Sequence, residues 1–285
     1  SILAYHKIDL QKELGINSIS PKKFERQIEF LKKEGYECLC PHFFCTKTED
    51  IYFSTINNYS AEIKKNILIT FDDGYEGIYY YAYPILKKYG FSATIFLTTG
   101  YIGKQNIWDT SPGPRFRHLN WCQIKEMADD GFIFGSHGVN HSFLTKQDSR
   151  TIKYETEASK SEIEDKLGKP VYLFSYPYGD YDNRVIDFVQ KAGYISAFSL
   201  KPDFVKVTSD DNHNLLLNKK VNDKYALPRF AIYLTDNILS LKIKIQCKES
   251  LSLTALQLMN QTINRCSYAS LLAERLKKIS KRFFY

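Results

Sequence analysis

The sequence predicts a single α/β domain whose parallel strands close into a barrel. Short apolar segments of strand-like composition alternate with longer segments of helical pattern along residues 2–198. Polar residues cluster directly after several of the apolar segments. In parallel α/β barrels the carboxyl ends of the strands form the face on which active sites are built. No low-complexity linker divides the chain, and no repeat of about 20 to 50 residues is visible beyond this alternation.

Size and composition agree with this class. A chain of 285 residues can bury a sizeable core, and its 44% hydrophobic and 25% charged residues exclude disordered, collagen-like and coiled-coil proteins. There is no apolar run of about 18 residues, so no membrane span is expected. The six cysteines show neither zinc-site nor disulfide spacing and are expected to be buried or free thiols.

The first elements are bounded by recognisable signals. Residues 2–5 are short and apolar and predict a buried strand. A helix is expected next, with Ser20 as its N-cap, Pro21 at its first position and Gly35 after its last turn. Residues 45–63 are expected to form a surface loop.

The middle of the chain continues the alternation. Residues 66–71 predict the next buried strand, 76–89 a helix closed by Gly90, and 92–97 another strand. A strand, a helix and a second strand in this order begin a parallel sheet. Residues 100–118 are expected to form a long loop near a site.

The later elements repeat the pattern, each helix being followed by a glycine. The expected helices are 121–130, 149–167 and 182–191, and the expected strands are 132–134, 171–174 and 194–198.

Two adjacent carboxylates, Asp72 and Asp73, follow the strand at 66–71 in the sequence TFDDG. Neighbouring side chains point apart, so one carboxylate can bind a metal while the other handles a proton. Asp-Gly is also common in turns, and this pentapeptide alone leaves both interpretations open.

His137 and His141 lie four residues apart just after a predicted strand. On a helical turn this spacing puts both imidazoles on one side, where they can hold one cation. A histidine pair alone is more often incidental. Together with a carboxylate, however, it makes the set of two histidines and one aspartate that leaves open positions on Zn²⁺ or a related ion.

Other polar residues carry weaker signals of their own. His6 alone is typical of a hydrogen-bonded histidine beneath a barrel rim, and Arg229 of a surface or salt-bridging residue. Tyr178 fits core packing, and Trp108 fits the anchoring of a loop. Each gains a functional interpretation only from the pattern that follows.

Three ordered motifs resemble those of the polysaccharide deacetylases of carbohydrate esterase family 4. They are TFDDG at 70–74, SHGVNH at 136–141 and FSYPYGDY at 174–181. The resemblance covers roughly residues 1–232. It implies a distorted (β/α) barrel, usually of seven strands, and a bound Zn²⁺, with Co, Ni or Mn as alternatives.

The resemblance also implies roles for particular residues. Asp73, His137 and His141 match the metal ligands, and Asp72 matches the general base that takes a proton from the attacking water. The backbone N–H of Tyr178 is expected to stabilise the tetrahedral oxyanion. The implied activity is de-N-acetylation of N-acetyl hexosamine units in a cell-envelope or extracellular polysaccharide.

The chain departs from the commonest family pattern in two places. Many members place the general acid in a late Leu-x-His motif, but residues 226–230 read ALPRF and contain no histidine. Many members also carry an arginine where Ser175 stands. Both differences could indicate an inactive relative.

We interpret them instead as marks of a separate branch. The opening LAYHKI at 3–8 and the form SYPYG are similar to the branch that deacetylates poly-N-acetylglucosamine. In that branch a histidine near the amino terminus is the general acid, which points to His6. Arg229 is then expected to replace the missing guanidinium and to orient Asp72.

Two other functions stay open from the sequence. The motifs determine the chemistry and not the length of the acceptor, so a lipid-linked or small sugar could be the substrate. An inactive glycan-binding relative would be favoured if His6 lay far from the metal.

Residues 1–235 are expected to form the barrel and 236–285 a basic helical extension. Residues 241–285 hold nine lysines and arginines against two glutamates, which accounts for the whole net charge of +7. The remaining chain is balanced, so nucleic-acid binding is not inferred. Apolar residues at steps of three or four predict an amphipathic helix in the extension. We expect it to pack on the barrel, with peripheral contact to an anionic membrane as the alternative.

Location and assembly are less constrained. The sequence begins at Ser1 without methionine, so a targeting segment could precede it. The resemblance favours an extracytoplasmic or cell-envelope location and leaves a cytoplasmic one open. The oligomeric state is not predicted.

Overall fold

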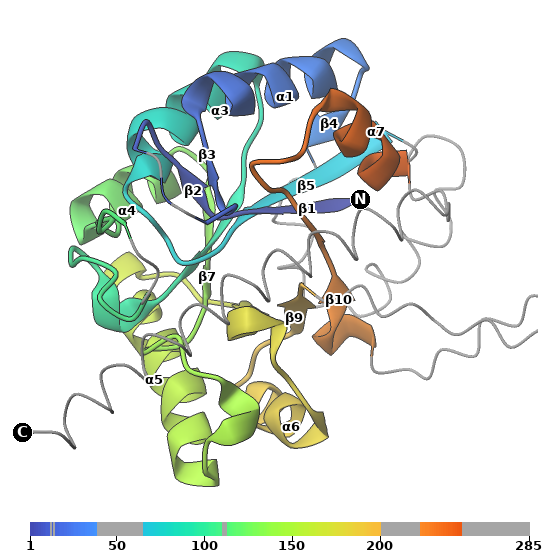
Figure 1. Cartoon of the computed structure of the whole chain (residues 1–285). Helices are drawn as coiled ribbons and strands as arrows, with labels where there is room; N and C mark the ends of the chain where they lie inside the picture. The colour runs from blue at the N-terminus through green and yellow to red at the C-terminus, as the bar shows by residue number, and fades with distance from the viewer. Residues whose placement is uncertain (12, 14, 39–64, 110–112, 201–222, 247–285) are drawn as a thin grey trace, which may run out of the picture.

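A computed structural model describes residues 1–11, 13, 15–38, 65–109, 113–200 and 223–246 (Figure 1). At its centre is a parallel sheet in the order β10-β9-β8-β7-β6-β5-β1-β11. Its strands are β1 (Ile2–Tyr5), β5 (Asn66–Phe71), β6 (Thr94–Leu97), β7 (Ile133–Ser136), β8 (Leu173–Ser175), β9 (Ser196–Ser199), β10 (Leu227–Pro228) and β11 (Phe230–Ala231).

One short segment closes this sheet into a barrel. β10 pairs with β9, β11 pairs with β1, and Arg229 alone separates the two. The sheet path holds eight strands, and counting 227–231 as one interrupted strand leaves seven. The predicted distorted (β/α)7 barrel is therefore confirmed, with its seam at Arg229.

Helices lie around the outside of the strands (Figure 1). In α1, for example, Phe24, Ile28 and Leu31 are completely buried. The helices are α1 (Pro21–Lys33), α3 (Tyr83–Tyr89), α4 (Trp121–Asp129), α5 (Ser149–Leu167), α6 (Asn183–Lys191) and α7 (Ile238–Gln246). Shorter elements are β2 (Lys7–Ile8), β3 (Ser18–Ile19), β4 (Glu37–Cys38), η3 (Ile78–Ala82), η4 (Thr99–Tyr101), η5 (Leu144–Lys146), η6 (Pro177–Gly179) and η7 (Asp223–Tyr225).

The helix predicted at 76–89 is the least regular of the expected elements. It begins with η3, a π-helical turn in which the N–H of Tyr83 donates to the carbonyl of Ile78. Pro84 explains the wider turn, because proline has no N–H to donate and its ring crowds the carbonyl four residues earlier. An ordinary α-helix then runs to Gly90, which has the left-handed conformation that ends it.

The predicted strands at 132–134, 171–174 and 194–198 each end one or two residues later than expected. Their last residues, Ser136, Ser175 and Ser199, are completely buried serines. A strand predicted from a run of apolar residues ends before such a terminal serine, because serine is polar. Here the hydroxyls are hydrogen-bonded inside the protein, as between Ser136 Oγ and Ser159 Oγ at 2.6 Å.

The described start of the C-terminal extension packs on the barrel. In α7, Lys244 forms a buried ion pair of 2.6 Å with Asp236, and the carbonyl of Ile245 accepts a hydrogen bond from Ser1 Oγ. The rest of the predicted extension, 247–285, and the expected loop at 45–63 lie outside the described residues. Within the described ranges no helix is long and apolar enough to cross a membrane.

Candidate active site

The residues singled out from the sequence gather at one end of the barrel, because each follows the carboxyl end of a parallel strand. His6 follows β1, Asp72 and Asp73 follow β5, His137 follows β7, and Tyr178 lies just after β8.

Asp73, His137 and His141 form a compact cluster in which one ligand atom of each lies within 4.8 Å of the others. Asp73 Oδ1 lies 3.4 Å from Nε2 of His137 and 3.1 Å from Nε2 of His141. It has no hydrogen-bond partner among the described residues, although it is buried. Three ligand atoms that face one another in this way suit a shared divalent cation.

The rest of the cluster fits the same donor set. His137 Nδ1 lies 2.7 Å from the carbonyl oxygen of Ser175, which fixes the ring and leaves Nε2 toward the cluster. Burial alone would raise the pKa of Asp73, but His141 and His137 outweigh it and hold that pKa well below its usual range. The carboxyl group is therefore ionised, as a metal ligand must be.

The two histidines meet by a different backbone route from the expected helical turn, and that expectation is wrong. Residues 137–141 follow a bend in which Gly138 has φ 78° and His141 has φ 54°. A Cβ at residue 138 would lie 2.8 Å from Glu155 Oε2, so glycine is required there by space as well as by conformation.

Glu155 holds this bend and was missed from the sequence. It is completely buried on α5, and its Oε2 accepts the N–H groups of Val139 at 2.6 Å and Asn140 at 2.9 Å. Its Oε1 accepts from the side chains of Asn140 and Ser142. Nothing in the sequence distinguishes Glu155 from its neighbour Glu157, whose side chain is 47% exposed.

We expect Glu155→Gln to loosen the bend at residues 137–141. Both oxygens of Glu155 accept hydrogen bonds, so the NH₂ group of a glutamine would face hydrogen-bond donors in either orientation of the amide. The free energy of unfolding should fall by about 1–3 kcal/mol. Affinity for an added divalent cation should fall by about 10–100-fold, as for other residues that support ligands. Chemical unfolding and zinc titration measure the two effects. Glu157→Gln on the same helix is the matched control, and equal behaviour of the two variants would remove Glu155 from this role.

Arg229 and Asp72 form a fully buried, two-pronged ion pair. Arg229 NH1 donates to Asp72 Oδ1 and NH2 to Oδ2, each at 2.7 Å, and neither side chain is exposed. Arg229 also donates to Ser175 Oγ at 2.7 Å and Thr70 Oγ1 at 3.1 Å. Burial raises the pKa of Asp72, but Arg229 together with His137 and His6 more than offsets it, so the pKa lies below its usual value. The structure thus places this guanidinium beside both Asp72 and Ser175.

His6 is placed at the same end of the barrel. Its Nδ1 is buried and has no hydrogen-bond partner among the residues described. Burial lowers the pKa of His6, while the nearby charges of Asp73 and Asp72 act to raise it. His6 directly follows Tyr5, whose carbonyl accepts the N–H of Asp72 at 2.9 Å, so His6 lies beside the segment that carries Asp72 and Asp73.

Aromatic side chains enclose His141. The ring of Trp108 stacks on it with centroids 3.9 Å apart, and the ring of Tyr178 meets it edge-on at 4.4 Å. The residue after Trp108, Asp109, is tied to the buried Lys7 at 3.0 Å. Trp108 is thus an anchored residue that packs directly on a member of the cluster.

Comparison with known proteins gives a consistent family. Residues 60–197 match the family model described as polysaccharide deacetylase. The chain is 33% identical over 202 residues to "Putative polysaccharide deacetylase YxkH" of Bacillus subtilis, covering 70% of this chain and 64% of that protein. It is 31% identical over 209 residues to "Poly-beta-1,6-N-acetyl-D-glucosamine N-deacetylase" of Staphylococcus aureus, covering 70% of this chain and 67% of that protein. The chain thus spans about two thirds of the length of these relatives.

Solved structures agree at the level of the whole barrel. The Streptococcus pyogenes deacetylase PplD in complex with acetate has a TM-score of 0.64 at 26% identity, covering 86% of this chain and 96% of that one. IcaB from Ammonifex degensii has a TM-score of 0.63 at 22% identity, with 86% and 96% covered, and shows the shared fold.

Proposed function

Because this chain belongs to the polysaccharide deacetylase family, we propose that it removes acetyl groups from N-acetyl hexosamine units of a cell-envelope or extracellular polysaccharide. The observation that carries the proposal is a buried Asp-His-His cluster directly beside an ionised carboxylate. The name of the Staphylococcus aureus relative supports poly-N-acetylglucosamine as the substrate class. An extracytoplasmic location follows from such a substrate.

Asp73, His137 and His141 would hold the divalent ion that family members use, and we propose zinc. Two imidazoles and one carboxylate are a frequent ligand set for catalytic zinc and also accept Co, Ni or Mn. A bound ion of this kind polarises a carbonyl oxygen and makes water more acidic.

The other residues of the site supply the proton transfers. Asp72 is the general base for the attacking water, and Arg229 keeps it ionised and oriented. His6 is the acid that protonates the leaving amine, which its place beside Asp72 and Asp73 supports. We assign the stabilisation of the oxyanion to the backbone N–H of Tyr178. The contact of the Tyr178 ring with His141 puts this residue beside the cluster and so supports the assignment. The nearness of His6 to the cluster also favours catalysis over an inactive glycan-binding role.

The zinc-loaded protein is expected to release acetate from β-1,6-linked N-acetylglucosamine oligomers. A chelator should abolish release and added zinc should restore it. Metal analysis should find about one divalent ion per chain, since the described residues contain one such cluster, and none in the double variant His137→Ala/His141→Ala. Retention of the ion by the double variant would refute the ligand assignment. Absence of acetate release from every N-acetylated glycan tested would refute the proposed activity.

A further inference from the structure

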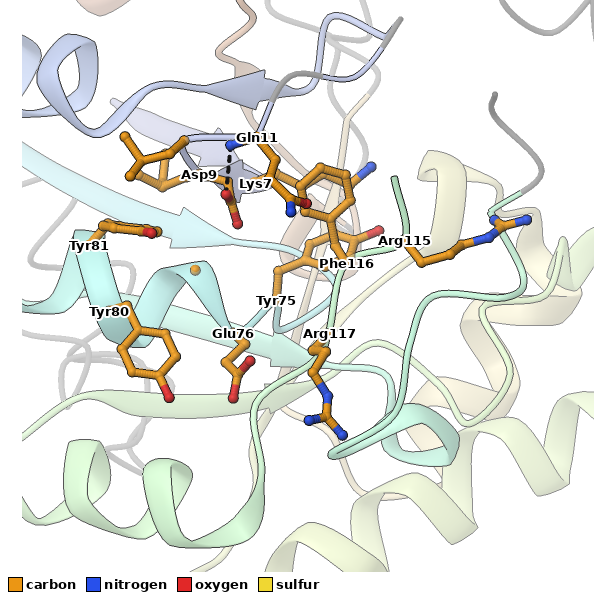
Figure 2. A pocket seen from close by; sticks show the side chains of 13 residues that line it. Lys7, Asp9, Gln11, Tyr75, Glu76, Tyr80, Tyr81, Arg115, Phe116 and Arg117 are labelled. Carbon is orange, nitrogen blue, oxygen red and sulfur yellow. Dashed lines mark hydrogen bonds between the residues drawn. The ribbon is translucent and has the colours of Figure 1, made fainter. Parts of the chain in front are cut away.

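A separate pocket of about 310 Å³ lies beside the start of η3 (Figure 2). Its walls come from residues 7–11, from 75–77 with 80 and 81, and from 115–117. Neither the three members of the metal cluster nor Asp72 and Arg229 line it. The volume is at the lower end of the range for small-molecule pockets, about 300–1,000 Å³.

The pocket is connected to the active site through two short stretches of the chain. Lys7 directly follows His6, and Tyr75 follows Asp73 with only Gly74 between them. Lys7 Nζ lies 5.0 Å from the centre of the Tyr75 ring, so these two buried side chains join the wall of the pocket to the edge of the site.

Its walls are held rigidly by backbone contacts. Gly77 packs so closely on β2 that a Cβ there would lie 2.2 Å from the carbonyl oxygen of Ile8. The N–H of Glu76 donates to the carbonyl of Arg117 at 2.8 Å, and this hydrogen bond joins the wall that contains Glu76 to the wall at 115–117. A pocket held in this way is formed before any ligand arrives, which lowers the entropy cost of binding.

The lining carries charged groups of both signs and one exposed aromatic ring. Asp9 and Glu76 contribute carboxylates, Arg115 and Arg117 contribute guanidinium groups, and the Tyr80 side chain is 57% exposed. Figure 2 shows Tyr80 and Glu76 on one side and Arg117 facing them.

The positive charge of Lys7 is already compensated. Lys7 forms buried ion pairs with Glu13 at 2.5 Å and Asp109 at 3.0 Å. The other charged groups of the lining are two carboxylates and two guanidinium groups, so the lining together with these ion pairs has no excess positive charge. An anion would meet Asp9 and Glu76, whereas hydroxyl and amide groups can donate to these carboxylates and accept from the arginines.

We propose that this pocket is an accessory subsite for a neutral sugar unit of the same polysaccharide, apart from the unit that loses its acetyl group. The proposal rests on the proposed function for its choice of ligand. A glycan chain that occupies both the active site and this pocket binds more tightly than a short fragment. Once one sugar unit is bound, the second unit binds within the same complex. Affinity for the glycan should therefore rise with the length of the oligomer, and this rise should depend on the pocket.

The test compares Tyr80→Ala with Tyr154→Ala, an equally exposed tyrosine (55%) on α5 that does not line the pocket. Both are made in the Asp72→Asn background, where hydrolysis should be slower by about 10²–10⁴-fold. Calorimetry measures binding of β-1,6-linked N-acetylglucosamine dimer and hexamer. Tyr80→Ala should weaken hexamer binding by about tenfold, which corresponds to about 1.4 kcal/mol. Dimer binding, and both affinities of Tyr154→Ala, should not change.

A second measurement uses the otherwise unaltered enzyme. Tyr80→Ala and Arg117→Ala should each raise KM for the hexamer while kcat for the hexamer and both constants for the dimer stay the same. Equal losses for dimer and hexamer, unchanged hexamer binding, or tighter binding of a sulfated hexamer would each overturn the proposal. If no oligomer releases acetate, the proposed activity fails, and the calorimetric comparison still decides whether this pocket binds the glycan.

Discussion

Arg229→Met is expected to lower the free energy of unfolding by about 3–5 kcal/mol, the largest loss of any single change in the site. The variant leaves the carboxylate of Asp72 buried without its two charge-assisted hydrogen bonds. It also removes the donors to Ser175 and Thr70. Chemical unfolding of the metal-free protein measures the loss, and Arg184→Met, at an exposed arginine, is the control.

Two further variants separate charge from geometry. Arg229→Lys keeps the positive charge but loses the planar fork, so an intermediate loss is expected. In Asp72→Asn/Arg229→Met no unpaired charge remains, and the combined loss should be smaller than the sum of the single losses. A loss below about 1 kcal/mol for Arg229→Met would show that the pair does not matter for stability, since that is the range of surface ion pairs.

The second large effect distinguishes the base from the acid. Asp72→Asn and His6→Ala should each lower kcat for glycan deacetylation by about 10²–10⁴-fold while metal content stays unchanged. Their effects should differ for an activated acetyl ester, because its leaving group departs without being protonated. We expect His6→Ala to retain ester hydrolysis and Asp72→Asn to lose it.

Measurements of acetate release and of zinc content on the same preparations check this expectation. Because Asp72→Asn leaves the buried Arg229 without its charged partner, folding of this variant is verified alongside activity. If His6→Ala cleaves the glycan at the unaltered rate, another residue protonates the amine. If both variants lose ester hydrolysis equally, His6 assists the attack of water on the carbonyl and not the departure of the leaving group.

Local signals predicted the elements that depend on local chemistry. β5 and α5 have the bounds expected from the sequence, because an apolar run with a following turn and a glycine stop act within a few residues. The π-turn at η3 was predictable only in retrospect, from the position of Pro84.

Features made by distant segments were not predictable in this way. Glu155 and Glu157 belong to the same polar stretch, and only the approach of residues 139–142 makes the first a buried acceptor. The closing strand at 227–231 is too short to give a periodic signal, and its pairing depends on the edges of β1 and β9. Arg229 was connected to Asp72 through the family pattern, since 157 residues separate them.

The position of the barrel closure at Arg229 also constrains the order in which the newly synthesised chain can fold. β1 is synthesised before the other described strands, yet its neighbour β11 is the last of them, so one edge of β1 and one edge of β9 stay unpaired until residues 227–231 arrive. Contacts between such distant segments form late and slowly. Because the segment that closes the barrel also carries the guanidinium, Asp72 lacks its two hydrogen bonds from Arg229 until that segment docks. The proposed base at Asp72 therefore gains its charged partner only in the step that closes the barrel.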